Sequence, residues 1–216
     1  MKKILIVDDH TILRQGVLRI LGEILDQPVA FEEACDGGQA IAMLNSGSYD
    51  LMLLDISLPD MNGLSVLKLL NQGGSKLPVI ILSTHPEEHY AVRSLRAGAA
   101  GYVNKGCDAT VLKEAIERVL SGKKFITPAQ SELLIDAISN RESIPLPETL
   151  SDREYQLICM MTAGKTLTEI ARNLSLSVKT ISTYRARILE KLQLRTTADI
   201  ISYGTHHKLT EFNFPT

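Results

Sequence analysis

The chain has 216 residues, of which 44% are hydrophobic and 22% charged, and its formal net charge at pH 7 is −2. This composition is typical of a soluble globular protein, and the length favours two domains over one. A near-neutral charge excludes a chain that is basic throughout. No apolar run reaches the roughly 20 residues that a membrane-spanning helix needs. The three cysteines lie far apart, so they predict buried thiols rather than a disulfide framework or a zinc site.

The first 121 residues alternate short apolar runs with helical patterns. Strands are predicted at 4–7, 29–33, 51–55, 79–82 and 101–103, and helices near 11–25, 37–45, 63–71, 87–97 and 109–121. This alternation indicates an α/β fold, a parallel sheet with helices on both faces. Apolar throughout, these strands are typical of parallel sheets buried on both sides. We expect a flavodoxin-like five-stranded sheet in the order 2-1-3-4-5.

Polar side chains follow these strands at their carboxyl ends. Asp8 and Asp9 follow the first strand, Asp55 ends the third, Ser83 follows the fourth and Lys105 the fifth. In this strand order ligands bind between strands one and three. Three carboxylates meeting there repel one another, and a hard cation such as Mg²⁺ would relieve the repulsion. The pattern predicts an Mg²⁺ site with Asp55 as a nucleophile for a phosphoryl group, whose charge Lys105 and Ser83 would help to hold.

The alternation of predicted strands and helices ends after about residue 121. Thr127-Pro128 predicts the start of a short helix that ends near residue 138, and a stretch with two prolines follows. Beyond it every pattern is helical, which places the boundary between two folding units within about 139–150. We therefore expect a first domain at 1–121, a linker with a short helix at 122–147 and a small all-α domain at 148–216.

The second domain contains the pattern of a helix-turn-helix. Capping boxes begin at Ser151 and Thr166, each with a glutamate three residues later, and Gly164 ends the first helix. Helices are predicted at about 167–174 and 178–193, separated by a short turn, which is the helix-turn-helix arrangement.

The 178–193 helix has an apolar face and a polar face. Its core stripe consists of Ile181, Tyr184, Ile188, Leu189 and Leu192. The opposite face is small and polar with basic edges, which suits a DNA major groove. The DNA contacts that we predict are Lys179, Ser182, Thr183, Ala186, Arg187 and Lys191. Since the central side chains are short, DNA shape is expected to carry part of the specificity. Arg185 lies nearer the apolar side, so internal pairing stays open for it.

The motifs "VDDH", "LLDISLPDMNG", "ILS" and "AGAAGYVNK" closely resemble the receiver domain of bacterial two-component response regulators, over about residues 2–121. The resemblance implies a phosphoryl group on Asp55 and a switch in which Tyr102 turns inward when Ser83 moves toward the phosphate; a packed edge-strand ring is the alternative for Tyr102. It also implies that Mg²⁺ is bound by Asp8, Asp9, Asp55 and the carbonyl of Ser57. The phosphoryl oxygens would be contacted by Ser83 and Lys105.

The stretch from about 148 to 209 resembles the LuxR-type DNA-binding domain, through "LSDRE" and "LTEIARNLSLSVKTISTYRARILEKL". A receiver followed by this domain is the layout of NarL/FixJ-type response regulators. The resemblance implies a sensor histidine kinase and double-stranded DNA as partners, a homodimer when phosphorylated, and no membrane. The start of the chain does not read as a signal peptide, so we expect a cytoplasmic protein.

The same residues also bear on other classes of protein. A metal-dependent phosphatase also uses an aspartate nucleophile, but "LLDISLPD" has no second aspartate two residues after the first to act as general acid. A nucleotide-binding domain would need a glycine-rich loop after the first strand, which is not there. A constitutive DNA-binding protein with a purely structural receiver stays open. We therefore expect a regulator rather than an enzyme, with only self-catalysed phosphoryl acceptance and slow loss.

Overall fold

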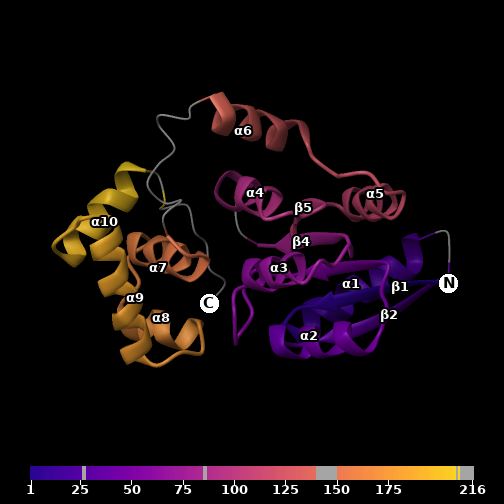
Figure 1. Cartoon of the computed structure of the whole chain (residues 1–216), viewed down its shortest axis with the longest axis horizontal. Helices are drawn as coiled ribbons and strands as arrows, with labels where there is room; N and C mark the ends of the chain where they lie inside the picture. Colours follow the sequence, from indigo (N-terminus) through magenta and orange to yellow (C-terminus); the bar gives the residue numbers. More distant parts are fainter. Residues whose placement is uncertain (26–27, 85–86, 140–149, 208, 210–216) are drawn as a thin grey trace. The chain divides into compact units, whose positions relative to one another are not determined.

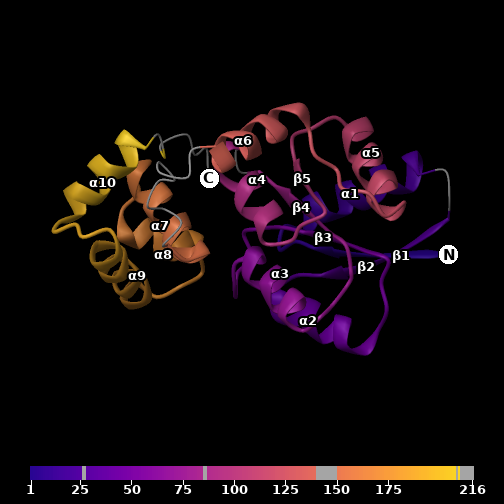
Figure 2. The same ribbon diagram turned by 45° about the horizontal axis from the view of Figure 1, so that its top comes forward.

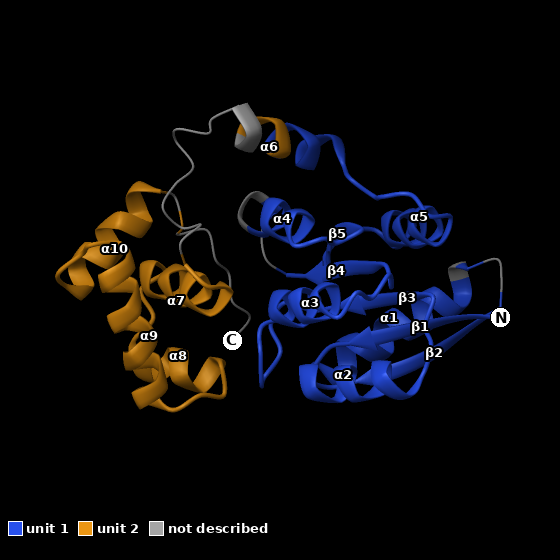
Figure 3. Cartoon of the chain, in the orientation of Figure 1, with its two compact units in different colours: residues 1–133 blue, residues 134–216 orange. Residues whose placement is uncertain are grey.

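The computed structural model describes residues 1–25, 28–84, 87–139, 150–207 and 209. The chain divides into two compact units, residues 1–133 and residues 134–216 (Figure 3). The segment predicted as a linker, 122–147, is thus shared between the two units, and its part from 140 onward lies outside the described residues. Among the described residues, no helix has both the length and the apolar character needed to cross a bilayer.

Unit 1 is built on the predicted five-stranded parallel sheet, in the order β2-β1-β3-β4-β5 (Figure 1). The strands are β1 (Lys2–Val7), β2 (Val29–Ala34), β3 (Leu51–Leu54), β4 (Val79–Ser83) and β5 (Gly101–Asn104). In the register of the central pair, Val7 lies beside Leu54. The residues that follow both strands therefore leave the sheet at the same edge, between β1 and β3.

The helices of unit 1 cover both faces of the sheet (Figure 2). They are α1 (Thr11–Ile24), α2 (Gly37–Ser46), α3 (Gly63–Gln72), α4 (Glu87–Arg96) and α5 (Ala109–Leu120). One core cluster joins alternate strand residues, such as Ile4, Leu53 and Ile80, to Leu21 of α1 and Ile116 of α5. Because side chains alternate along a strand, the intervening residues face the opposite layer, where α2 and α3 pack together.

The chain after α5 stays attached to the edge of the sheet before it enters α6 (Pro128–Ser139). The backbone N–H of Phe125 donates to the carbonyl of Ala100 at 2.8 Å, and Phe125 pairs with Gly101 as an isolated parallel bridge. The buried side chain of Gln130 then donates to the carbonyl of Tyr102 at 2.9 Å. The first turn of α6 is thereby fixed to β5.

Unit 2 contains α7 (Asp152–Thr162), α8 (Leu167–Asn173), α9 (Val178–Lys191) and α10 (Thr197–His206). The capping boxes predicted at Ser151 and Thr166 are both present, and Thr196 forms a third, unpredicted one. The turn between α8 and α9 contains Ser175 at a φ of 52°. The N–H of Leu176 then donates to the carbonyl of Ala171 at 2.9 Å, which closes the end of α8.

The cysteines agree only in part with the prediction that they are buried. Cys159 on α7 is buried, but Cys35 at the end of β2 is exposed and Cys107 is half-buried. None of these three cysteines, all within the described part of the chain, forms a disulfide bond. The prediction was wrong for Cys35 because this residue follows the last residue of an edge strand, where the chain leaves the sheet.

Candidate functional site

The predicted acidic residues converge at the carboxyl ends of β1 and β3. The backbone N–H of Asp55 donates to the carbonyl of Val7 at 2.9 Å, which places Asp55 beside Asp8 across the strand pair. Both side chains are almost fully buried, with 2% of Asp8 and 3% of Asp55 exposed. Two carboxylates in such a place are costly unless a cation neutralises them.

Lys105 supplies that cation from the end of β5. Its ammonium lies 2.8 Å from Oδ2 of Asp55 and 2.7 Å from Oδ2 of Asp8. Burial lowers the pKa of Lys105, but the two carboxylates more than offset this and raise the pKa above its ordinary value. Lys105 is therefore charged at neutral pH, and the predicted acid–lysine group is one contiguous cluster.

Burial is the main cause that raises the pKa of Asp55 above its ordinary value. The neighbouring Asp8 raises it further, whereas Lys105 and the backbone N–H of Ser57 lower it. The groups around Asp55 therefore do not fully neutralise the negative charge of its ionised form. An additional cation beside it would complete the neutralisation.

Asp9 extends the cluster toward solvent and contacts His10, for which no role was predicted. Nδ1 of His10 lies 2.8 Å from Oδ1 of Asp9, and the backbone N–H of His10 donates to Oδ1 of Asp8 at 2.8 Å. Ligand atoms of Asp8, Asp9, His10 and Asp55 all lie within 4.8 Å of one another. The adjacency of His10 to the acidic pair in the sequence was the available signal for this position.

The loop from β3 to α3 passes so close to Asp55 that only glycine fits at one position. A Cβ at Gly63 would lie 2.0 Å from the backbone oxygen of Asp55. The carboxylate of Asp60 in the same loop accepts from the N–H groups of Gly37 and Gly38, at 3.0 and 2.8 Å. It thereby ties the loop to the N-terminus of α2, a contact that the sequence pattern did not reveal.

Ser83 and Tyr102, the predicted switch pair, lie on the neighbouring strands β4 and β5 and are both fully buried. The carbonyl of Ser83 accepts the backbone N–H of Lys105 at 2.8 Å, so the ends of these strands are adjacent. Tyr102 is inward in this structure, and its backbone carbonyl is the acceptor for Gln130. Through its backbone carbonyl, Ser83 contacts Lys105 at the end of β5. Through its own carbonyl, Tyr102 contacts the first turn of α6.

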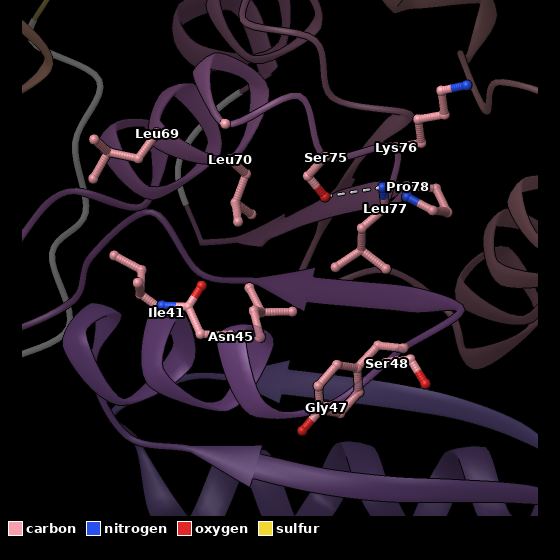
Figure 4. Close-up of a pocket in the computed structure, with 13 residues that line it drawn as sticks. Ile41, Asn45, Gly47, Ser48, Leu69, Leu70, Ser75, Lys76, Leu77 and Pro78 are labelled. Carbon is pink, nitrogen blue, oxygen red and sulfur yellow. Dashed lines mark hydrogen bonds between the residues drawn. The ribbon is translucent and has the colours of Figure 1, made fainter.

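A pocket of about 540 Å³ lies at the opposite end of the sheet (Figure 4). It is bounded by α2, α3 and the two segments that lead into β3 and β4, with Leu69 and Leu77 among its apolar walls. None of the acidic residues at the carboxyl ends of the strands lines it. It is therefore separate from the acid–lysine cluster.

In unit 2, α9 presents most of the predicted DNA contacts to solvent. Its apolar stripe is inward as expected, with Ile181 and Ile188 fully buried. The exposed positions on the other side are Lys179, Thr183, Ala186 and Arg187, and Ser182 is half-buried. Val178, which is not among the predicted contacts, is 44% exposed at the first turn.

Two basic residues of α9 have partners inside unit 2. The ammonium of Lys191, predicted to reach a DNA phosphate, lies 2.6 Å from Oε2 of Glu154 on α7. Nη1 of Arg185 donates to the hydroxyl of Thr197 at 2.9 Å, which is the internal pairing left open for it. Of the two predicted phosphate contacts, Arg187 is thus better placed for DNA than Lys191.

Comparisons with known proteins match both units. Residues 4–117 match the family model of the response regulator receiver domain, and residues 148–203 match that of bacterial regulatory proteins of the luxR family. The chain is 32% identical over 211 residues to the response regulator UvrY of Escherichia coli K12, covering 97% of this chain and 96% of UvrY.

Solved structures show the same likeness over nearly the whole chain. RcsB of Salmonella typhimurium is 25% identical, with a TM-score of 0.58 over 95% of this chain and 100% of that one. A structure described as an RcsB–DNA complex is also 25% identical, with a TM-score of 0.57 over 94% of this chain and 98% of that one. The chain belongs to the two-component response regulators of the NarL/FixJ type, a receiver domain followed by a LuxR-type helix-turn-helix domain. Because this is a family of transcription regulators, the alternatives of a phosphatase and of a nucleotide-binding domain are rejected.

Proposed function

We propose that Asp55 accepts a phosphoryl group from a sensor histidine kinase, and that this modification controls the binding of unit 2 to double-stranded DNA. The observation that carries the proposal is the buried cluster in which Lys105 contacts both Asp55 and Asp8. In the transfer, a carboxylate oxygen of Asp55 forms a bond to phosphorus as the bond to the donor nitrogen breaks. Lys105 is placed to offset charge on the phosphoryl oxygens, and we assign the same task to Ser83.

We assign Mg²⁺ to the same cluster, with Asp9, Asp55 and the carbonyl of Ser57 as ligands and Asp8 as an assisting group. The fit rests on the donor set: hard carboxylate oxygens converge within 4.8 Å, and Asp9 keeps the cluster open to solvent. Mg²⁺ prefers such oxygen ligands and retains several waters. When bound, it would supply positive charge where the phosphoryl oxygens develop negative charge.

We propose that Ser83 and Tyr102 form the switch between the phosphoryl group and the rest of the chain. Both are buried on adjacent strands, so a shift of Ser83 would change the space beside Tyr102. A two-state receiver biased by a local change in charge is a common form of such regulation. We propose that residues 1–121 act as the receiver domain, residues 122–147 as the linker and residues 148–216 as the DNA-binding domain.

For unit 2 we propose that α9 enters the major groove of DNA. The exposed basic residues Lys179 and Arg187, together with the DNA complex described for RcsB, support this role. Such modules usually bind paired half-sites as two-fold dimers, so we propose a homodimer in the phosphorylated state. A cytoplasmic location, where kinase and DNA are both accessible, completes the proposal.

The decisive experiment is intact-mass analysis of the full chain after incubation with a small phosphodonor and Mg²⁺. A gain of one phosphoryl group, about 80 Da by composition, is expected for the wild type and not for Asp55→Asn. Asp50→Asn is a matched control, because Asp50 precedes the other end of β3 and pairs with Lys2. DNA binding is then measured with and without the adduct. An absent adduct in the wild type would favour the alternative of a constitutive DNA-binding protein with a structural receiver.

A further inference from the structure

The outward face of α9 consists of two parallel rows of side chains at four-residue spacing. One row contains Val178, Ser182 and Ala186, and the other contains Lys179, Thr183 and Arg187. Side chains four apart lie above one another on a helix, so each row is a continuous ridge. The face that would meet DNA is therefore a narrow strip of small groups beside a partly basic one.

The polar groups on this strip are poorly suited to reading a base edge by paired hydrogen bonds. Asn, Gln and Arg make the two-pronged contacts that distinguish bases, and neither row has an Asn or Gln. The guanidinium carbon of Arg187 lies 6.0 Å from the ring centre of Tyr184, which turns this side chain toward the flank of the helix. Lys179 is a single flexible charge, suited to a phosphate.

Thr183 presents its methyl group to solvent while its hydroxyl proton is used within the helix. The Oγ1 atom donates to the carbonyl of Lys179, one turn earlier in the same helix, at 3.1 Å. The side chain is exposed, so the methyl group is free to meet a ligand, whereas the hydroxyl keeps only its role as an acceptor. Val178, 44% exposed, and the exposed Ala186 add two further apolar groups on the neighbouring ridge.

We propose that α9 selects its DNA sites by packing these apolar groups against thymine 5-methyl groups in the major groove. The thymine methyl is the apolar feature of that groove, and Ala and Thr methyls are suited to contact it. The exposed Glu190, four residues beyond Ala186, would be repelled by phosphates at the far end of the ridge. The groove therefore receives the part of α9 up to Arg187. This inference deepens the proposed function and rests on DNA binding by unit 2.

The test uses the phosphorylated full chain and duplexes selected from a random-sequence pool. Each thymine of the selected duplex is replaced in turn by deoxyuracil, which lacks only the 5-methyl group. At a contacted thymine the replacement should weaken binding about fourfold, the factor that corresponds to burial of one methyl group. Replacement at thymines outside the contacted positions should leave the affinity unchanged.

Matched variants separate the methyl contact from other causes. Thr183→Ser keeps the hydroxyl and removes the methyl, so the preference for thymine over uracil at one position should vanish. Thr183→Val keeps a methyl and removes the hydroxyl, so that preference should persist. Val178→Ala shortens the side chain but keeps one methyl group, so it should weaken the preference at a different position. All three substitutions lie on an exposed surface, where they disturb folding little.

Two results would overturn the inference while leaving DNA binding intact. One is selective binding that uracil replacement never weakens. The other is a thymine preference that persists at full strength in both Thr183→Ser and Val178→Ala, which would assign it to DNA shape instead. A chain that enriches no sequence would overturn the inference and also count against sequence-specific regulation.

Discussion

The ammonium of Lys105 lies 2.8 Å from Asp55, and the same atom lies 2.7 Å from Asp8. One buried cation therefore serves two buried carboxylates, and one negative charge remains in excess among these three groups. The arrangement leaves capacity for a further cation, because neutralisation by Lys105 alone is incomplete. The uncompensated charge also lowers the folding stability of unit 1.

Asp55→Asn is therefore expected to stabilise unit 1 in metal-free buffer. Burial and Asp8 raise the pKa of Asp55 above the ordinary 3.8. The contribution of its protonated form to folding stability is therefore complete only below pH 3.8, and it is lost as pH rises through the folded-state pKa. At pH 7 the ionised group destabilises the fold, and the amide should raise the free energy of unfolding by about 1 kcal/mol. Urea unfolding in a chelator, followed by circular dichroism, measures this. A lower unfolding midpoint in the variant would contradict it, and Asp50→Asn serves as the control.

Glu154→Gln should destabilise unit 2 in a pH-dependent way. Burial raises the pKa of Glu154, but hydrogen bonds from Lys191 and Ser151 bring it below the ordinary 4.5. The ionised group therefore stabilises the fold above pH 4.5, and this effect is lost as pH falls through the lowered folded-state value. We expect a loss of about 1 kcal/mol at neutral pH. The unfolding curves of the two proteins should differ at neutral pH and converge at acid pH. An equal difference at both pH values would contradict the ion-pair explanation.

Gly204→Ala should destabilise unit 2 because α7 and α10 approach closely there. A Cβ at Gly204 would lie 1.9 Å from Oγ1 of Thr162, so a helix must shift. Overpacking of this kind typically costs about 1–3 kcal/mol. The double variant with Thr162→Ala should recover part of the loss, since it removes the atom in the way. Gly22→Ala is the control: the space around it is empty, so the same change should stabilise α1 slightly.

Arg187→Ala and Lys191→Met should separate a DNA contact from a structural one. Arg187 is exposed, so its loss should reduce the slope of log affinity against log salt by about 0.9, the value for one phosphate contact. Lys191 is bound to Glu154, so its replacement should lower the unfolding midpoint and leave the slope unchanged. Salt titrations of binding to one duplex provide both slopes. A slope change of the same size in Lys191→Met would show that Lys191 leaves Glu154 for DNA.

Much of the fold could be predicted from the sequence because its signals are local. The continuous apolar runs gave the strands to within a residue or two, and the capping residues at Ser151 and Thr166 marked the helix starts. The convergence of Asp8, Asp55 and Lys105 followed from strand order alone, without any side-chain geometry.

Other features depend on contacts between segments that no local pattern announces. Lys191 has the spacing of a DNA contact, yet its partner Glu154 lies 37 residues earlier, on another helix. Asp60 holds the start of α2 from the loop after β3, and Gln130 reaches back to Tyr102. Such pairings are set by three-dimensional packing, so single-residue patterns could not show them.

The hydrogen bond from Gln130 to the carbonyl of Tyr102 ties α6 to β5, the strand that leads to Lys105. Free energies of coupling between two sites are reciprocal. If phosphorylation at Asp55 shifts α6 through β5, then a restraint on α6 must change the affinity of the Asp55 pocket for its phosphoryl group by the same factor. Target DNA that restrains α6 would then act as an allosteric effector, and the promoter itself would help to set how long the signal lasts.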